Sequence, residues 1–557
     1  MSTARTSDLW WKNAVVYCLD IETFLDSDGD GRGDITGLIE RVDYLAGIGV
    51  SCLWLMPFYP SPNRDDGYDI ADYYSVDPTL GSLGDFVALV RTAKDRGMRV
   101  IIDLVVNHTS DRHPWFRDAR RSRTARYRDF YVWSDEKPKE PENAVVFPDA
   151  EDSIWTYDER TEQWYLHHFY GHQPDLNIAN PAVRDEITKI AGFWLQLGVD
   201  GFRVDAVPYL LETGEAGGNA PTLDPHEVLR DLRAFISRRK GDALLLGEVN
   251  LPANDLRAYF GDDDQLQMSF DFPLMQAMYL ALARHDAKPI RKVLGDRPPL
   301  PDEGQWAVFV RNHDELTLDQ LSDKEREEVF AAFGPEEDMQ LFGRGLRRRL
   351  PPMVDGDPDR IRLVYSLLFS LPGTPVLFYG EEIGMGENLD IDGRLSVRTP
   401  MQWTDERNGG FSSARPSQLT RPVVEGRFSP LAVNVADQRR DRDSLLNWFE
   451  RVIRRRRECP EIGWGKVTLI ETTGSPAVLA HRCDWERSAI VVLHNLGVEP
   501  CNVRVPIDDA ADFDRLVDLL EESEPVHELA EPHIEVKLQP YGFRWFRLQR
   551  TGTRTTP

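Results

Sequence analysis

The chain has 557 residues, of which 41% are hydrophobic and 29% are charged, with a formal net charge of −27 and an isoelectric point near 4.9. This length exceeds one compact core and predicts roughly two to four domains. The acidic balance excludes nucleic acid as a partner, because no basic stripe exists to replace condensed counterions. A neutral small-molecule substrate fits this composition better.

No segment of the sequence predicts secretion or membrane insertion. Residues 1–8 lack the apolar core of a signal peptide, and no stretch approaches the roughly 18 apolar residues that span a membrane. The five cysteines show no metal-ligand spacing and are expected to be reduced core residues. We therefore expect a cytoplasmic protein without a membrane partner. The oligomeric state stays open, a homo-oligomer included.

Short apolar runs alternate with helix-like segments along the first 380 residues, which is the pattern of a parallel α/β fold. Eight such runs predict a closed (β/α)₈ TIM barrel, in which active groups lie at the carboxyl ends of the strands. The predicted strands are residues 14–20, 51–56, 99–106, 200–204, 243–249, 265–272, 306–310 and 375–379.

Three further segments interrupt or follow this pattern. Residues 108–178 are rich in Trp, Tyr, His, Asp and Pro and too long for an ordinary connection, so they predict a small inserted domain after the third strand. The charged, helical excursion at 316–358 is expected to cap the site. After residue 463 the alternation of apolar and polar residues predicts a C-terminal antiparallel β-sandwich. The predicted domains are a barrel of 1–107 and 179–462, the insertion, the sandwich of 463–550, and a disordered tail of 551–557.

The early turn Asp-Ser-Asp-Gly-Asp-Gly-Arg-Gly-Asp at 26–34 places carboxylates at its first, third, fifth and ninth positions. Oxygen ligands at this spacing can wrap a hard cation. The twelfth position is Gly37, not the bidentate glutamate of an EF-hand, so a single-loop calcium site is expected, with magnesium as the alternative. A solvated acidic turn is the competing interpretation. The predicted ligands are Asp26, Asp28, Asp30, Asp34 and the backbone carbonyl of Arg32.

Arg203 and Asp205 lie two positions apart at the end of the fourth run, so both side chains point from one strand face. A carboxylate beside a fixed guanidinium stays ionised and can act as a nucleophile, while a carboxyl group in a drier setting can hold a proton for the leaving group. An isolated Arg-x-Asp is more often a structural ion pair. Glu248 and Asp314 follow later runs, and this ordered set predicts an active site.

Five blocks in order resemble those of glycoside hydrolase family 13, the α-amylase family, and the resemblance covers nearly the whole chain. It implies that Asp205 is the nucleophile, Glu248 the general acid/base and Asp314 a third carboxylate that binds sugar hydroxyls. Such a pair of carboxyl groups, roughly 5–5.5 Å apart, retains the anomeric configuration through a covalent glycosyl-enzyme. The matching blocks are Asp103-Leu-Val-Val-Asn-His108, Gln173-Pro-Asp-Leu-Asn177, Gly201-Phe-Arg-Val-Asp205, Gly247-Glu248 and Asn312-His-Asp314. The supporting residues are Arg203, His108 and His313.

The same resemblance implies a closed pocket for a non-reducing glucose. In the segment Asp65-Asp-Gly-Tyr68, Asp65 is expected to hydrogen-bond this sugar and Tyr68 to stack beneath it. Phe169 is a further expected wall residue, and Gln173 is expected to bind substrate; ordinary core packing is the alternative for the rings of Tyr68 and Phe169. A second calcium site of the family type would use Asn107, Asp175 and Glu212 with the carbonyls of Tyr209 and Leu210. No organic cofactor is expected.

Within the family, several stretches are similar to those of trehalose synthases, which are maltose α-glucosyltransferases. The clearest are Arg311-Asn-His-Asp-Glu-Leu-Thr-Leu and Arg398-Thr-Pro-Met-Gln-Trp403. The resemblance implies intramolecular transglucosylation between maltose and trehalose, with water kept out of the pocket. Arg398 and Glu315 are expected to close the mouth as an ion pair.

The stretch from Tyr17 to Phe24, which includes the end of the first predicted strand, departs from this pattern, because Glu22 stands where these synthases typically carry an arginine. The departure puts the substrate in doubt and leaves the catalytic set intact. An exo-acting α-glucosidase, or a transglucosylase with another acceptor such as one using sucrose, would share every catalytic residue. A non-catalytic binding relative would be expected to have lost a carboxylate and to carry a membrane segment.

Overall fold

The computed structural model describes residues 9–141, 144–210, 225–507, 513–520, 526–529 and 532–550. Eight parallel strands close into a barrel in the order β1-β14-β10-β9-β8-β7-β3-β2, and each predicted run overlaps one of them. The sequence could show these strands because their residues are buried on both faces, which produces continuous apolar runs. The barrel strands are β1 (Val16–Leu19), β2 (Cys52–Leu55), β3 (Arg99–Leu104), β7 (Gly201–Val204), β8 (Leu244–Gly247), β9 (Met268–Phe270), β10 (Gln305–Phe309) and β14 (Thr374–Phe378).

Helices surround the barrel, and local signals set their ends. Helix α1 ends at Gly49 and α4 at Gly198, both with the left-handed backbone that glycine adopts at little cost. Helix α2 begins with a capping box between Ser82 and Asp85. The longer helices are α1 (Ile35–Ile48), α2 (Leu83–Asp95), α4 (Pro181–Leu197), α6 (Pro225–Arg239), α8 (Phe272–Arg284), α9 (Lys288–Asp296), α10 (Asp323–Phe333), α12 (Pro358–Ser370) and α14 (Leu445–Arg457). The shorter ones are α3 (Pro114–Ala119), α7 (Ala253–Arg257), α11 (Leu350–Met353), α13 (Val435–Arg440) and α15 (Pro460–Trp464).

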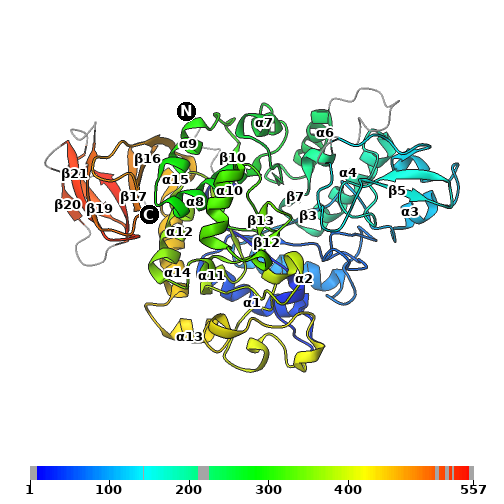
Figure 1. Cartoon of the computed structure of the whole chain (residues 1–557), viewed down its shortest axis with the longest axis horizontal. Coiled ribbons are helices and arrows are strands. Elements are labelled where there is room, and N and C mark those ends of the chain that lie inside the picture. Colours follow the sequence, from blue (N-terminus) through cyan, green and yellow to red (C-terminus); the bar gives the residue numbers. More distant parts are fainter. Residues whose placement is uncertain are drawn as a thin grey trace.

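Two smaller units lie at opposite ends of the molecule (Figure 1). The insertion after β3 holds an antiparallel sheet of β4 (Trp133–Ser134), β6 (Gln163–Leu166) and β5 (Trp155–Asp158). The C-terminal unit, orange to red in Figure 1, has a six-stranded sheet and a two-stranded sheet, in agreement with the predicted sandwich. Its strands are β15 (Lys466–Leu469), β16 (Val478–Trp485), β17 (Ser488–Asn495), β18 (Cys501–Pro506), β19 (Arg515–Asp518), β20 (Val526–Glu528), β21 (His533–Leu538) and β22 (Phe543–Gln549).

Two long connections approach the barrel mouth. The excursion between β10 and β14 contains α10 and a small sheet of β11 (Leu316–Thr317), β13 (Gly345–Leu346) and β12 (Gln340–Leu341). The segment between β14 and α13 has neither α-helix nor strand; short 3₁₀ turns such as η7 (Gly393–Val397) are its only regular elements. Among the described residues, no helix combines the length and the apolar character needed to cross a bilayer.

Candidate active site

The ionisable residues of the predicted site meet at the carboxyl ends of the barrel strands. Asp205 directly follows β7 and Glu248 directly follows β8, while Asp103 is the penultimate residue of β3. The backbone amide of Glu248 donates to the carbonyl of Val204, so the ends of β7 and β8 are held side by side. Strand register thus fixes the relative positions of the two carboxyl groups.

Arg203 is the centre of this arrangement, with only 1% of its surface exposed. Its Nη1 lies 2.6 Å from Oδ1 of Asp205 and its Nη2 lies 2.8 Å from Oε2 of Glu248. The same guanidinium also binds Asp103 and donates to Tyr68 Oη at 3.3 Å. One planar cation therefore bridges nucleophile and acid, which favours the short separation of a retaining pair over the roughly 6.5–9.5 Å of an inverting pair.

Burial and the neighbouring charges together give the three carboxyl groups different pKa values. Burial raises the pKa of Glu248 to about 7, although Arg203 opposes the shift, and it raises the pKa of Asp205 to about 6. Burial would also raise the pKa of Asp314, but His313, Arg394 and Arg398 outweigh it and hold that pKa well below its usual range. Glu248 is thus the group that holds a proton near neutral pH, as a general acid must.

These pKa values predict a bell-shaped pH dependence of kcat/KM for the free enzyme. Activity should rise as pH passes about 6, because the nucleophile Asp205 must be ionised, and fall above about 7, because Glu248 must be protonated. Rates of α-glucoside cleavage measured from pH 4 to 9 at low substrate test this. A flat profile through pH 9 would contradict the acid role of Glu248.

The predicted sugar-binding residues surround this pair. Tyr68 Oη lies 2.8 Å from His313 Nε2, and the two rings stack with centroids 5.5 Å apart. Gln173 Nε2 donates to Asp65 Oδ2 at 2.9 Å. His108 is buried, and its Nε2 has no hydrogen-bond partner among the described residues, so this nitrogen is suited to a substrate hydroxyl.

Aromatic rings from the insertion and from the excursion meet above the site. The ring of Phe147, in the insertion, stacks on that of Tyr170 with centroids 4.6 Å apart. It also contacts the ring of Phe342, in the excursion, with centroids 5.1 Å apart. The predicted wall residue Phe169 contacts Phe147 at 5.9 Å and His108 at 5.2 Å. The two connections therefore form a common aromatic roof.

Sequence reasoning missed Arg394, which binds two of the site's carboxylates at once. Its Nη2 lies 2.6 Å from Oδ1 of Asp65 and its Nη1 2.6 Å from Oδ1 of Asp314, and its guanidinium packs 4.8 Å from the Phe147 ring. Its position four residues before Arg398 was the only available signal, because the surrounding segment has no helix or strand periodicity.

The predicted ion pair between Arg398 and Glu315 was wrong. Arg398 points inward, where Nη1 lies 2.6 Å from Asp66 and Nη2 lies 2.9 Å from Asp314. Glu315 instead pairs with Arg344 of the excursion at 3.2 Å. Each of these carboxylates thus has a cationic partner, Arg398 for Asp66 and Asp314 and Arg344 for Glu315; a charge left unpaired at such buried positions would be costly.

The Asp26–Asp34 loop forms the carboxylate group expected of a cation site. Ligand oxygens of Asp26, Asp28 and Asp34 lie within 4.8 Å of one another, and Asp30 is not part of this group. Amides of Gly29 and Gly31 donate to Asp26 at 2.7 and 2.8 Å and fix its orientation. This hard-oxygen donor set fits calcium or magnesium. Asp34 also caps α1 by accepting from the amide of Gly37; the carbonyl of Arg32 stays a predicted ligand.

The second predicted cation site is described only in part. Asn107 Nδ2 donates to Asp175 Oδ1 at 3.1 Å, and the other Asp175 oxygen binds His168. Asn107 Oδ1 is buried and has no hydrogen-bond partner in the part of the chain that the structure describes. Glu212 lies outside the described residues. The ring of Tyr209 packs 5.2 Å from that of His168, and the carbonyls of Tyr209 and Leu210 stay predictions.

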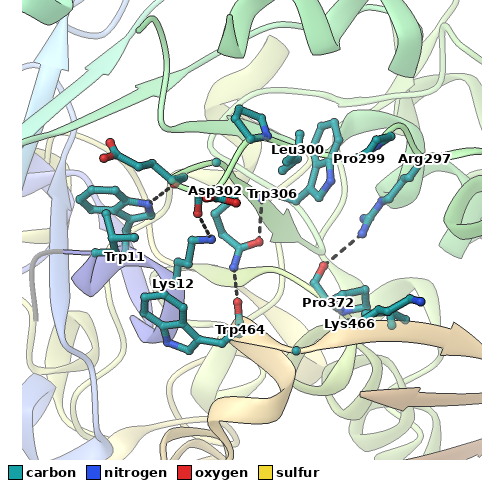
Figure 2. Close-up of a pocket in the computed structure, with 18 of the residues that line it drawn as sticks. Trp11, Lys12, Arg297, Pro299, Leu300, Asp302, Trp306, Pro372, Trp464 and Lys466 are labelled. Carbon is teal, nitrogen blue, oxygen red and sulfur yellow. Dashed lines mark hydrogen bonds between the residues drawn. The ribbon is translucent and has the colours of Figure 1, made fainter. Parts of the chain in front are cut away.

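A separate cavity of about 1380 Å³ contains none of the catalytic carboxylates (Figure 2). It lies between the amino-terminal residues, the segment before β10 and the start of the C-terminal unit, and its lining includes Trp11, Lys12, Trp306 and Trp464. Active groups of this barrel lie at the carboxyl ends of the strands, so the cavity is distinct from the catalytic mouth.

The barrel and its carboxylates define a glycoside-acting enzyme, and comparison with known proteins places it in a family. The α-amylase catalytic domain matches residues 21–332 and 348–465, and the sucrose hydrolase-like C-terminal domain matches residues 488–547. The chain therefore belongs to glycoside hydrolase family 13, the α-amylase family.

Similar proteins support the same assignment. The chain is 42% identical to "Trehalose synthase/amylase TreS" of Mycolicibacterium smegmatis, over 98% of this chain and 94% of that protein. It is 40% identical to a trehalose synthase of Pimelobacter, over 98% and 97% of the two chains. The crystal structure of an α-amylase from H. orenii superposes with a TM-score of 0.76 at 29% identity, covering 97% of this chain and all of that one.

Proposed function

We propose that this enzyme interconverts maltose and trehalose by intramolecular transfer of a glucosyl group. The observation that carries the proposal is the aromatic roof of Phe147, Tyr170 and Phe342 above the carboxylates, with Arg394 joining Asp65 to Asp314 beneath it. A covered site retains the released glucose and excludes water. The likeness to proteins named trehalose synthase supports the same activity.

The residues suggest a two-step mechanism. Glu248 protonates the glycosidic oxygen of maltose while an Asp205 oxygen attacks the anomeric carbon, so that the C–O bond breaks and a glucosyl-Asp205 ester forms. The released glucose turns within the pocket, and its anomeric hydroxyl attacks the anomeric carbon of the glucosyl-enzyme while ionised Glu248 takes the hydroxyl proton, so that the bond from this carbon to the Asp205 oxygen breaks. The second displacement frees Asp205 and leaves the α configuration at the transferred glucose.

Proton NMR of maltose and trehalose incubations tests this activity. We expect each sugar to yield the other with only minor free glucose. Glucose as the sole product would assign an α-glucosidase instead, an activity named for relatives at about 30% identity such as a probable α-glucosidase of Rhizobium meliloti, which is 32% identical.

Opening the roof provides a second reading of the same experiment. Phe342→Ala should raise the ratio of hydrolysis to isomerisation by several-fold, because it removes the ring that contacts Phe147. Tyr157→Ala is the matched control, since this ring of the insertion is 44% exposed and contacts only Trp164 among the described rings. Equal product ratios in wild type and Phe342→Ala would contradict water exclusion by the roof.

We further propose that the protein is cytoplasmic. A separate proposal is that the Asp26–Asp34 loop binds calcium or magnesium as a structural ion. The ion would order the loop at the start of α1 and takes no part in the proton transfers. Removing it with EDTA should lower Tm by ~2–5 °C, since a site saturated about 100-fold above Kd contributes ~2.7 kcal/mol. Asp28→Asn should abolish the shift; an EDTA-independent Tm in the wild type would contradict the site.

A further inference from the structure

Three acidic side chains gather beneath the sugar-binding residues. Carboxylate oxygens of Asp20, Glu22 and Asp66 lie within 4.8 Å of one another, and the three side chains are between 5% and 10% exposed. Asp20 and Glu22 follow β1, and Asp66 follows β2. Because buried carboxylates at this spacing repel one another, the cluster needs a cation.

The one arginine that contacts all three among the described residues is Arg421, which is 6% exposed. Arg32 also pairs with Glu22 at 3.1 Å, and Arg398 with Asp66 at 2.6 Å. Nη1 of Arg421 lies 3.1 Å from Asp20 Oδ2, its Nη2 lies 3.4 Å from Glu22 Oε2, and it also hydrogen-bonds Asp66. A group of acids whose spacing would suit a metal ion is thus already occupied by a side chain. Arg421 comes from the segment between β14 and α13, far from the others in sequence.

The cluster is joined directly to the sugar-binding residues. Asp66 Oδ2 binds Arg398 Nη1 at 2.6 Å, and Arg398 Nη2 binds the catalytic Asp314 at 2.9 Å. Arg421 Nη1 also donates to the backbone carbonyl of Arg398 at 2.8 Å. Arg398 is therefore held both at its backbone, by Arg421, and at its guanidinium, by a carboxylate that Arg421 orients.

The backbone of Asp66 depends on the same contacts. Its φ is 51°, in the left-handed region that residues other than glycine rarely adopt. Such a conformation persists only where the surroundings fix it. The two arginines that bind opposite oxygens of Asp66 provide that restraint.

We propose that Arg421 is a positioning residue for sugar binding, which binds Asp20, Glu22 and Asp66 together and so holds Arg398 on Asp314. It also bears on Glu22, at whose position the resemblance to trehalose synthases implies an arginine. Arg421 brings a guanidinium to within 3.4 Å of the Glu22 side chain from another segment. The inference depends on the glycosidic chemistry of the family, not on the proposed maltose–trehalose activity.

The first test measures kcat and KM of Arg421→Met on p-nitrophenyl α-glucoside, well below its Tm. We expect kcat to fall about 100-fold and KM to rise, because a small displacement of a binding group has such an effect even when the mutation is remote from the chemistry. Arg456→Met is the matched control: Arg456 is fully buried and bonds Asn13 and the carbonyl of Gly373, away from the mouth. It should lower Tm and leave kcat of the folded protein unchanged.

The decisive variant moves the guanidinium from position 421 to position 22, which follows β1. In Glu22→Arg/Arg421→Met a guanidinium would again lie beside Asp20 and Asp66, and Arg32, whose side chain is 34% exposed, can turn into solvent. We expect kcat to recover at least tenfold over Arg421→Met. Wild-type kcat and KM in Arg421→Met would overturn the proposal.

If Arg421→Met does not fold, the double variant Glu22→Arg/Arg421→Met and the single variant Arg421→Lys test the proposal instead. Lysine keeps the charge but cannot bind the carboxylates and the Arg398 carbonyl together. The proposal expects the double variant within tenfold of wild type and Arg421→Lys reduced about tenfold. A double variant that folds but lacks activity, or a lysine variant with unchanged kcat, would contradict it. The aryl glucoside reports cleavage even if no trehalose forms, so failure of the proposed function remains distinguishable.

Discussion

Asp205→Ala is expected to lower kcat by about 10⁴-fold or more on every α-glucoside, because it removes the atom that forms the covalent intermediate. The folded protein should not be weakened. Burial and the neighbouring charges of Asp103 and Asp314 raise the pKa of Asp205 to about 6, so its removal relieves repulsion within the site. Unchanged or higher Tm together with lost turnover would separate chemistry from stability.

A small anion should partly replace the lost carboxylate. Sodium azide added to Asp205→Ala can occupy the space beside Arg203 and attack the anomeric carbon from the same side as the missing oxygen. With an activated aryl α-glucoside the expected product is β-glucosyl azide, of inverted configuration. Residual activity within tenfold of wild type, or an α-configured azide product, would contradict the nucleophile assignment.

Glu248→Gln should give the second largest loss, and its size should depend on the leaving group. For maltose, whose departing oxygen needs a proton, we expect kcat to fall by about 10³–10⁴-fold. For an aryl glucoside with an acidic phenol, formation of the glucosyl-enzyme needs little proton donation and should be far less affected. The glutamine side chain preserves the size of Glu248 and can still approach Arg203. Its oxygen can also accept from the backbone amide of Ala206, which donates to Glu248 Oε2 at 3.2 Å in the wild type.

The pH profile gives the control for this variant. The decline above about pH 7 should disappear in Glu248→Gln, because the group that must stay protonated is gone. The rise that belongs to Asp205 should remain. Equal losses on maltose and on the activated glucoside would show that residue 248 acts in binding and not as the acid.

The barrel could be predicted from the sequence because its physical signal is local. Each strand is an apolar run, and Asp205 and Glu248 follow directly after two of them, so element identity alone located the carboxylates. The Asp26–Asp34 turn was likewise visible, since all its carboxylates lie within nine consecutive residues.

The arginines around the site could not be found in the same way. Arg394 and Arg421 lie in a segment without α-helix or strand, where no long periodicity indicates which side chains point inward. The partner of Arg398 was wrongly predicted for a related reason: a long side chain can reach several carboxylates, and Arg344, from a distant part of the chain, pairs with Glu315 while Arg398 binds Asp66. The consequence of Glu22 became clear only from the position of Arg421.

The central claim is transfer of glucose within one closed pocket, and isotope exclusion tests it most directly. Unlabelled maltose would be converted in the presence of excess ¹³C-glucose, and the trehalose formed would be analysed by NMR and mass spectrometry. Intramolecular transfer predicts trehalose that is essentially free of label throughout the reaction. Label entering trehalose in proportion to the free glucose would show that the acceptor exchanges with solvent and would contradict the enclosed-pocket mechanism.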